Sequence, residues 1–326
     1  MRLGGNRNAS RGERLRGRLF DKFAANLSIW FPDTSDIFVC PVCRTQHTRE
    51  SLMTRPPLLA LGHIVPQALG GGSETLVCRA CESDLSAAFD RAVADEKNYH
   101  EWQSGKRTAD AFASQPEGNI TFVLNTSEDR PRLTTDSNRS SPEAREALIG
   151  RLTSERGTKF TVRIPTYHEQ HRDLSYLYHA FLAMFDAFGY EFAFAREMNR
   201  VRALLLGNER ANLRSILRSM KATSTDMPEL PPHINVASSE DHPACFFVAL
   251  PPMLLKETAR GVILPGPDPE SVRYFDSLVD SPEPYSGEMQ LTWVPREKLL
   301  SLDDPYSRGQ MRWIFREFSG TTTLTP

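Results

Sequence analysis

The chain has 326 residues, of which 40% are apolar and 25% are charged, and its formal net charge is −2 at pH 7. This length allows two or three domains with a sizeable core, and the balanced charge argues for no particular partner. No apolar run reaches about 18 residues, so we expect no membrane span, and the basic N-terminus lacks the apolar stretch of a secretory signal.

The first part of the chain, residues 1–30, is expected to be a basic arm followed by a short helix. Residues 1–22 carry seven basic side chains against two acidic ones, a local charge of +5. Residues 1–18 lack apolar periodicity, which predicts a flexible arm that could neutralise phosphates. A solvated terminus without a partner is the alternative. Apolar residues at helical spacing predict a helix from Phe20 to Trp30, stopped by Pro32.

Four of the five cysteines form two Cys-x-x-Cys pairs, Cys40 with Cys43 and Cys78 with Cys81. Together they offer four thiolates, a tetrahedral donor set that Zn²⁺ accepts readily. Because every position is filled by sulfur, we expect a closed, structural zinc that does not activate water. Such pairs fit a reducing compartment better than a disulfide framework, so the cytoplasm is the expected location.

Strands and a helix are expected around these cysteine pairs. Ile37–Val39 predicts a strand that leads into Cys40. A mostly apolar run over 56–65, ended by Pro66, predicts a second strand, and Thr75–Val77 predicts a third. Apolar residues at helical spacing predict an amphipathic helix over 82–96. The expected order after the first cysteine pair is therefore strand, loop, strand, cysteine pair, helix.

The remaining region, 104–326, is expected to be mixed α/β. Its first part predicts strands at 120–124 and 159–164, a helix at 144–152, and turns over 125–143. Helices are expected over about 173–220, as segments 173–188 (closed by Gly189), 194–206 and 209–220. The β-rich part, 233–295, predicts an antiparallel sheet from five short segments, 234–236, 246–250, 262–264, 272–278 and 289–294.

Three reactive side chains in this region are expected to be structural. His179 and Tyr178 lie near the apolar stripe of the strongest helix, which favours core or helix-surface roles over ligation. Cys245 enters a predicted strand, where a buried free cysteine is the expected state. A cysteine hydrolase built on Cys245 is the remote alternative.

The cysteine-rich stretch resembles a known family. Its motifs are Cys40-Pro-Val-Cys43, then His63-Ile-Val-Pro66 with a following Leu-Gly-Gly, then Thr75-Leu-Val-Cys78-Arg-Ala-Cys81. This layout of about 40 residues resembles the HNH endonucleases of the ββα-metal fold that carry an accessory zinc knuckle. A further stretch, Leu174–Leu206, resembles the helical region that follows the motif in a group of bacterial HNH-type proteins. The resemblance implies an α+β protein, with a zinc-stapled ββα-metal (HNH or treble-clef-like) domain over 31–103 and a helical and antiparallel β region after it.

In that family the first histidine is the general base, a role that the resemblance gives to His63. A divalent ion, Mg²⁺ or Mn²⁺, stabilises the charge that develops on the phosphodiester. The residue before the histidine is normally an acidic ligand of that ion, but here it is Gly62. The third motif position is Glu82, whose carboxylate can bind a hard cation; the alternative is a helix N-terminal carboxylate stabilised by the dipole. Asp90 lies eight residues beyond Glu82, too far along a helix to share one ion with it.

The resemblance predicts metal-dependent hydrolysis of nucleic acid, DNA rather than RNA. The glycine loop at 70–72 could approach a phosphate backbone or could only form a tight turn. The C-terminal region would select the substrate or bind a protein partner. The alternative function is a catalytically degenerate zinc module that binds nucleic acid or protein, in which His63 is structural. Phosphate contacts are expected from basic residues near the site and in the arm, namely Arg44, Arg79, Arg14, Arg16 and Arg18.

Overall fold

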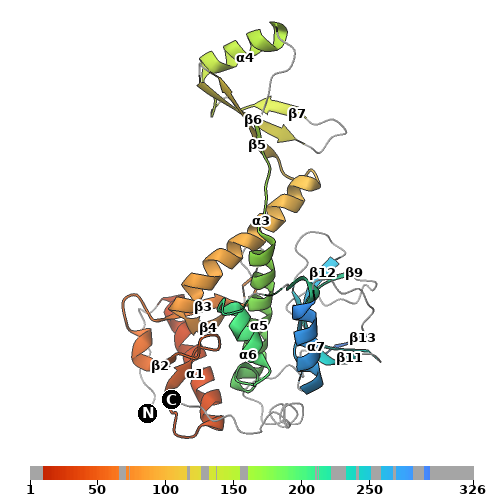
Figure 1. Cartoon of the computed structure of the whole chain (residues 1–326). Helices are drawn as coiled ribbons and strands as arrows, with labels where there is room; N and C mark the ends of the chain where they lie inside the picture. The colour runs from red at the N-terminus through yellow and green to blue at the C-terminus, as the bar shows by residue number, and fades with distance from the viewer. Residues whose placement is uncertain are drawn as a thin grey trace. The chain divides into compact units, whose positions relative to one another are not determined.

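The fold is that of a computed structural model, shown in Figure 1. The chain divides into two compact units: one combines residues 1–91 with 169–326, and the other is 92–168. The division expected from sequence, with a boundary at 103/104, differs from these units because the chain returns to the first unit at residue 169. The described residues are 10–65, 71–72, 74–115, 118–125, 132–136, 138–154, 161–209, 211, 213–221, 233–239, 242–250, 258–266, 269–281 and 290–293.

The first unit opens with helix α1 (Arg11–Trp30), so the expected flexible arm is wrong for residues 11–18. The reason is a capping box. Ser10 Oγ accepts a hydrogen bond from the Glu13 amide at 3.2 Å, and the Glu13 carboxylate accepts one from the Ser10 amide at 2.7 Å. These bonds satisfy amides that a helix start leaves unpaired, and the second one lowers the pKa of Glu13. The helix ends at Trp30, just before Pro32 as predicted.

Two small hairpins follow α1. Strand β1 (Ile37–Val39) pairs with β2 (Gln46–Thr48), and the short helix η1 (Arg49–Leu52) comes next. Strand β3 (Leu59–His63) pairs antiparallel with β4 (Glu74–Cys78), in a register that sets His63 opposite Glu74. This confirms the predicted strands around the cysteine pairs.

The long regular helix after β4 begins later than expected. The chain passes through α2 (Arg79–Cys81) and a π-helical turn, η3 (Glu82–Ser86), before α3 (Ala87–Gln103). The predicted order of strand, strand and helix therefore holds, but Glu82 lies in a wide turn rather than in the regular helix.

Helix α5 (Glu169–Ala193) forms the centre of the first unit, and most of its side chains are buried. It is broken at Gly189, whose φ of 64° lies in the left-handed region, so the expected stop there is correct and a further turn follows. The rings of Phe185 and Phe23 of α1 stack with centroids 4.3 Å apart. Beyond the break, the Tyr190 hydroxyl donates to Val39 O and accepts from Val39 N, both at 2.8 Å, which ties α5 to the strand before Cys40.

The C-terminal part of the first unit is a five-stranded antiparallel sheet in the order β13-β10-β11-β12-β9. Helix α6 (Met198–Leu205) and the turn η4 (Leu213–Ser215) precede it. The other elements are β9 (Leu217–Lys221), β10 (His233–Ser239), β11 (His242–Leu250), β12 (Thr258–Leu264), α7 (Pro269–Asp280) and β13 (Gln290–Trp293).

Two sequence predictions are wrong in this part. The expected helix at 209–220 is a turn followed by strand β9, because pairing with β12 overrides helical propensity. The expected strand at 272–278 is helix α7, whose buried residues Ser271, Phe275, Leu278 and Val279 follow a helical period. The other predicted strands of the sheet are present.

The second unit contains most of α3, a four-stranded antiparallel sheet in the order β7-β6-β5-β8, and helix α4. Besides α3, its elements are β5 (Ala109–Gln115), β6 (Gly118–Asn125), β7 (Arg132–Thr135), α4 (Pro142–Ser154) and β8 (Thr161–Arg163). Strands β5 and β7 were not predicted, and β7 falls within the expected loop. A small core of Ala111, Ile120, Phe122, Ala144 and Leu148 joins α4 to the sheet. The protein is thus of the α+β class with small antiparallel sheets, and none of its described helices is long and apolar enough to cross a membrane.

Candidate metal centre and histidine cluster

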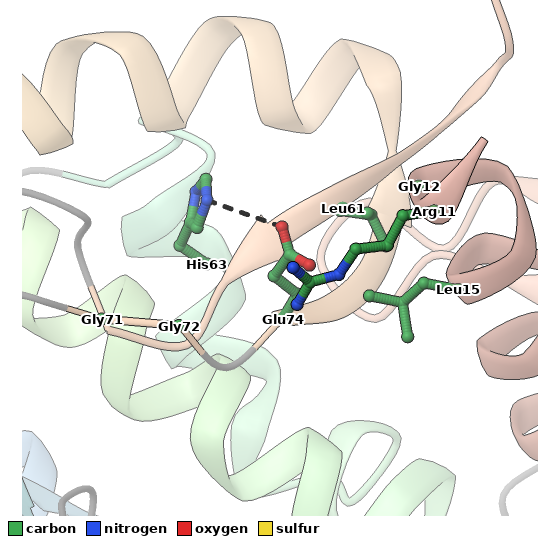
Figure 2. A pocket seen from close by; sticks show the side chains of 8 residues that line it. All are labelled: Arg11, Gly12, Leu15, Leu61, His63, Gly71, Gly72 and Glu74. Atoms are coloured by element: carbon green, nitrogen blue, oxygen red, sulfur yellow. Dashed lines mark ion pairs between the residues drawn. The ribbon is translucent and has the colours of Figure 1, made fainter.

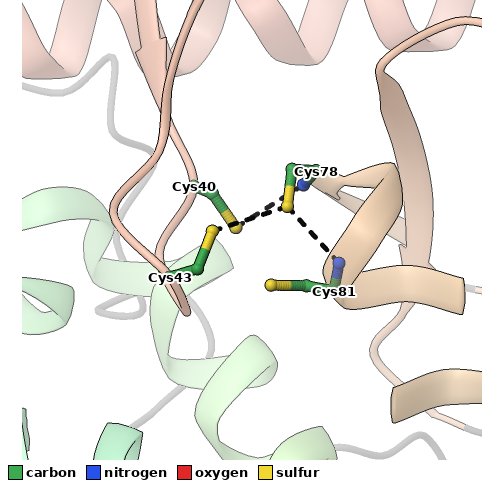
Figure 3. Close-up of side chains that lie close together, drawn as sticks. All are labelled: Cys40, Cys43, Cys78 and Cys81. Atoms are coloured by element: carbon green, nitrogen blue, oxygen red, sulfur yellow. Dashed lines mark hydrogen bonds between the residues drawn. The ribbon is translucent and has the colours of Figure 1, made fainter. Parts of the chain in front are cut away.

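The two cysteine pairs come together at the ends of the two hairpins (Figure 3). The Sγ atoms of Cys40, Cys43, Cys78 and Cys81 all lie within 4.8 Å of one another, and all four thiols are free. Cys43 Sγ and Cys78 Sγ are 3.5 Å apart, far beyond a disulfide bond and suitable for two ligands of one ion. This confirms a four-cysteine group positioned to hold a metal ion, and no other such group occurs among the described residues.

Backbone geometry shapes the first cysteine pair. Arg44 N donates to Cys40 O, and Cys40 N donates to Thr45 O, both at 2.9 Å. The turn places Arg44 at a φ of 63°, a conformation that disfavours residues other than glycine. Its side chain is held by Asn199 Oδ1 at 3.0 Å and lies over the Phe194 ring. Arg44 therefore has a structural role next to the four-cysteine group, in addition to its predicted role as a phosphate contact.

The second cysteine pair lies where β4 becomes helical. Cys78 caps α2, and its sulfur accepts a hydrogen bond from Cys81 N at 3.4 Å. The Cys40 sulfur accepts one from Cys78 N at 3.5 Å. Burial raises the pKa of the Cys40 thiol, so a thiolate there requires a cation among the four sulfurs. The donor set therefore fits a bound metal ion.

His63 lies at the end of β3 with a side chain that is 16% exposed. Its Nε2 is 3.8 Å from Glu74 Oε1, and its Nδ1 is 4.0 Å from Asp90 Oδ2. Both nitrogens are buried, and neither has a hydrogen-bond partner within the described part of the chain. Glu74 was not singled out from the sequence; the signal that finds it is strand register, which places it opposite His63.

His179 of α5 completes this cluster, although the sequence favoured a core role for it. The side chain is indeed buried, at 1% exposure. Its Nδ1 lies 2.8 Å from the carbonyl oxygen of His63, and its Nε2 lies 3.4 Å from Asp90 Oδ1. His63, Asp90, His179 and Glu74 thus form what we call the histidine cluster.

Glu82 lies on the other side of β3. Burial raises the pKa of Tyr178 well above its ordinary value, so its hydroxyl stays protonated and donates to Glu82 Oε2 at 3.3 Å. A Cβ added to Gly62 would lie 3.3 Å from the same oxygen. Since neighbouring residues of a strand face opposite sides, the Glu82 carboxylate lies beside Gly62 and the histidine cluster lies on the His63 side. The ligand role of Glu82 stays a prediction.

A pocket of about 310 Å³ opens beside His63 (Figure 2). His63 and Glu74 line it together with Arg11 of α1 and with Gly71 and Gly72, the described part of the glycine loop. A second pocket of about 500 Å³ lies along α1, between Arg11, Arg14, Gly17, Arg18 and Asp21. Arginine side chains at both pockets therefore come from the segment that was expected to be a flexible basic arm.

The remaining predicted basic residues lie elsewhere. Arg16 is on α1 but lines neither pocket. Arg79 is exposed at the start of α2, where its Nε donates to Pro57 O. Arg11, which the sequence did not single out, is the arginine that shares a pocket with His63.

Together, the fold and site define an α+β protein with a four-cysteine group positioned to hold a metal ion and a separate histidine cluster. A scan against protein-family models and searches of curated proteins and of solved structures found no match.

Proposed function

We propose that this protein is an HNH-type endonuclease, which hydrolyses phosphodiester bonds of nucleic acid, DNA in preference to RNA. The observation that supports this most is the position of His63. Its imidazole lines the same pocket as Arg11, and both ring nitrogens are buried without a hydrogen-bond partner among the described residues. A base and a phosphate-binding cation in one pocket are the parts that phosphodiester hydrolysis needs.

His63 is the proposed general base. Nε2 is the proposed proton-accepting nitrogen, with the ring hydrogen on Nδ1, which faces Asp90 Oδ2 at 4.0 Å. Nε2 is the nitrogen nearer to Glu74, which also lines the pocket. Proton transfer from water to Nε2 would generate the attacking hydroxide.

The proposed phosphate contacts come mainly from α1. Arg11, Arg14 and Arg18 are spaced at i, i+3 and i+7, so they form one stripe of positive charge on the helix. Such a stripe attracts a nucleic-acid backbone and positions it without reading its sequence. Arg16, Arg44 and Arg79 remain proposed outer contacts.

Two metals belong to the proposal. A structural Zn²⁺ at the four cysteines would hold the β1–β2 and β3–β4 hairpins together, because binding energy in such sites is folding energy. A divalent ion, Mg²⁺ or Mn²⁺, would neutralise charge that develops on the phosphate and the leaving oxygen. Glu82 is the proposed carboxylate ligand, and Asp90, too distant to share the ion with it, is the alternative on the helical segment after β4.

The test is a cleavage assay with supercoiled plasmid and with single-stranded RNA, each in Mg²⁺ and in Mn²⁺. We expect the wild-type protein to nick plasmid, and His63→Ala to lose at least about a hundredfold in rate, the scale of general-base catalysis. The matched control is His171→Ala, which changes an exposed histidine of α5. Circular dichroism would verify that each variant is folded.

Cleavage that persists unchanged in His63→Ala would refute the role of His63. The absence of cleavage with every ion and substrate, with retained binding of duplex DNA, would instead favour the non-catalytic zinc module. The observation behind that alternative is Gly62, which has no side chain to bind an ion.

A further inference from the structure

We infer that Asp90 and His179 together bind the divalent ion, in place of Gly62 and Glu82, and that the site accepts Mn²⁺ and similar transition metals in preference to Mg²⁺. The inference deepens the proposed nuclease function, because the ion would serve that reaction. Its basis is the contact between two buried polar atoms, Asp90 Oδ1 of α3 and His179 Nε2 of α5. His179 lies outside the motif that led to the family resemblance.

Hydrogen bonding determines which nitrogen of His179 carries a hydrogen. Its Nδ1 is 2.8 Å from His63 O, and a carbonyl oxygen can only accept, so Nδ1 must donate. In a neutral imidazole, Nε2 then presents a lone pair. That lone pair meets Asp90 Oδ1, 3.4 Å away, and neither atom has a hydrogen-bond partner among the residues that the structure describes. Two facing acceptors repel each other unless a cation lies between them.

The separation favours a metal ion over a proton as that cation. An N–H···O hydrogen bond spans about 2.7–3.2 Å, less than the 3.4 Å between His179 Nε2 and Asp90 Oδ1. Two ligands at about 2.0–2.2 Å from one ion lie from about 2.8 Å apart at a right angle to about 3.6 Å at a tetrahedral angle, a range that includes 3.4 Å. The hydrogen bond from His179 Nδ1 to a backbone carbonyl is also the contact that usually orients a metal-binding imidazole.

The surroundings distinguish this pair from Glu82. The Glu82 carboxylate accepts from Tyr178 beside Gly62, whereas Asp90 faces both imidazoles of the histidine cluster. An ion at Asp90 would therefore lie on the same side of β3 as the proposed base. One nitrogen ligand selects Mn²⁺, Co²⁺, Ni²⁺ or Zn²⁺ over Mg²⁺, which prefers oxygen. With two protein ligands, the remaining coordination positions are left for water and a phosphate oxygen.

The experiment measures Mn²⁺ binding without nucleic acid. Protein with its four-cysteine group filled by zinc would be titrated with Mn²⁺, and free ion would be followed by electron paramagnetic resonance. We expect one Mn²⁺ per chain, and a loss of more than tenfold in affinity in Asp90→Asn and His179→Gln. Asp84→Asn, which changes an exposed carboxylate of the same helical segment, is the matched control and should bind as the wild type does.

Because His179 is buried, its variant could fail to fold, so a second measurement uses the wild-type protein. Bound Mn²⁺ should broaden the imidazole NMR signals of His179 and His63 much more than those of His171, which lies eight residues, about 12 Å of helix, before His179. A sharp His179 Nε2–H signal that persists with excess Mn²⁺ would overturn the inference in favour of a buried ion pair. Loss of Mn²⁺ binding in Glu82→Gln with retention in Asp90→Asn would overturn it as well.

The outcomes separate this inference from the nuclease proposal. Mn²⁺ binding at Asp90 and His179 without cleavage of any substrate would leave the metal site standing and refute the nuclease. Cleavage that depends on His63, in a protein whose Mn²⁺ affinity is the same in wild type and Asp90→Asn, would refute only the metal site.

Discussion

Gly62 and Glu82 share one space: a Cβ added to Gly62 would lie 3.3 Å from Glu82 Oε2 and 3.1 Å from Val77 Cγ2. A side chain at position 62 and a carboxylate at position 82 therefore compete for the same volume. HNH endonucleases, which the sequence resembles, have an acidic residue before this histidine; here that position is Gly62, and the Glu82 carboxylate lies beside it.

This competition predicts the effect of placing an acidic side chain at position 62. Gly62→Asp should destabilise the protein by about 1–3 kcal/mol, because it overpacks the space and sets two carboxylates together. The double variant Gly62→Asp with Glu82→Ala should recover part of that loss. Guanidinium unfolding measures both. A double variant that is as unstable as the sum of the single changes would show that the two positions do not interact.

The break in α5 predicts a large effect of a single methyl group. A Cβ on Gly189 would lie 2.2 Å from Asn26 Oδ1, the atom that accepts from Tyr190 N, and the φ of 64° disfavours any side chain. Gly189→Ala should lose about 3 kcal/mol or more through steric overlap and strain. Gly207 has a similar φ of 72° with open space around it, so Gly207→Ala should lose only about 1 kcal/mol. If Gly189→Ala and Gly207→Ala lowered the melting temperature equally, the steric overlap at Gly189 would have no effect on stability, which would contradict this prediction.

Removal of metal should unfold the hairpins that carry the cysteines. We expect about one equivalent of zinc per chain, and a strong chelator should lower the melting temperature, since binding supports folding. Cys78→Ser should retain much less zinc. Cys245→Ala is the control, because this buried cysteine of β11 is not part of the four-cysteine group and its variant should keep the metal. Elemental analysis after gel filtration measures the outcome; a metal-free wild-type protein that melts unchanged would contradict it.

The arginine stripe of α1 predicts how binding responds to salt. Each lost phosphate contact should make the slope of log K against log salt shallower by about 0.9 for duplex DNA. Arg11→Ala with Arg18→Ala should therefore change the slope by about 1.8. Arg273→Ala, an exposed arginine of α7, is the control. Fluorescence polarisation over a range of salt concentrations measures the slopes, and an equal change in the control would mean that binding has no preference for α1.

Local patterns predicted much of the fold. The spacing of Cys40, Cys43, Cys78 and Cys81 was sufficient for the metal group, because a Cys-x-x-Cys turn is a local structure. Apolar periodicity predicted α5, in which most side chains are buried. The start of α1 was missed because its stability comes from the bonds between Ser10 and Glu13, within a polar segment that has no hydrophobic pattern. For α7, a short window of β-branched and aromatic residues concealed a helical burial period.

Local sequence patterns predict only part of the histidine cluster. Glu74 could have been found by pairing β3 with β4, since register is a local consequence of the hairpin. His179 could not, because it meets His63 across 116 residues and its own helix gives only the reason for its burial. Contacts of that range depend on how whole elements pack, which a single sequence does not reveal.

The discontinuous first unit has a consequence for the order of synthesis. Residues 92–168 form their own unit between the Asp90 and His179 positions, so the ribosome releases the four cysteines and His63 well before His179. A nascent chain can therefore gather zinc and fold its hairpins while the Asp90–His179 pair is still incomplete. The proposed Asp90–His179 metal site would then be completed only after residues 92–168 have been synthesised.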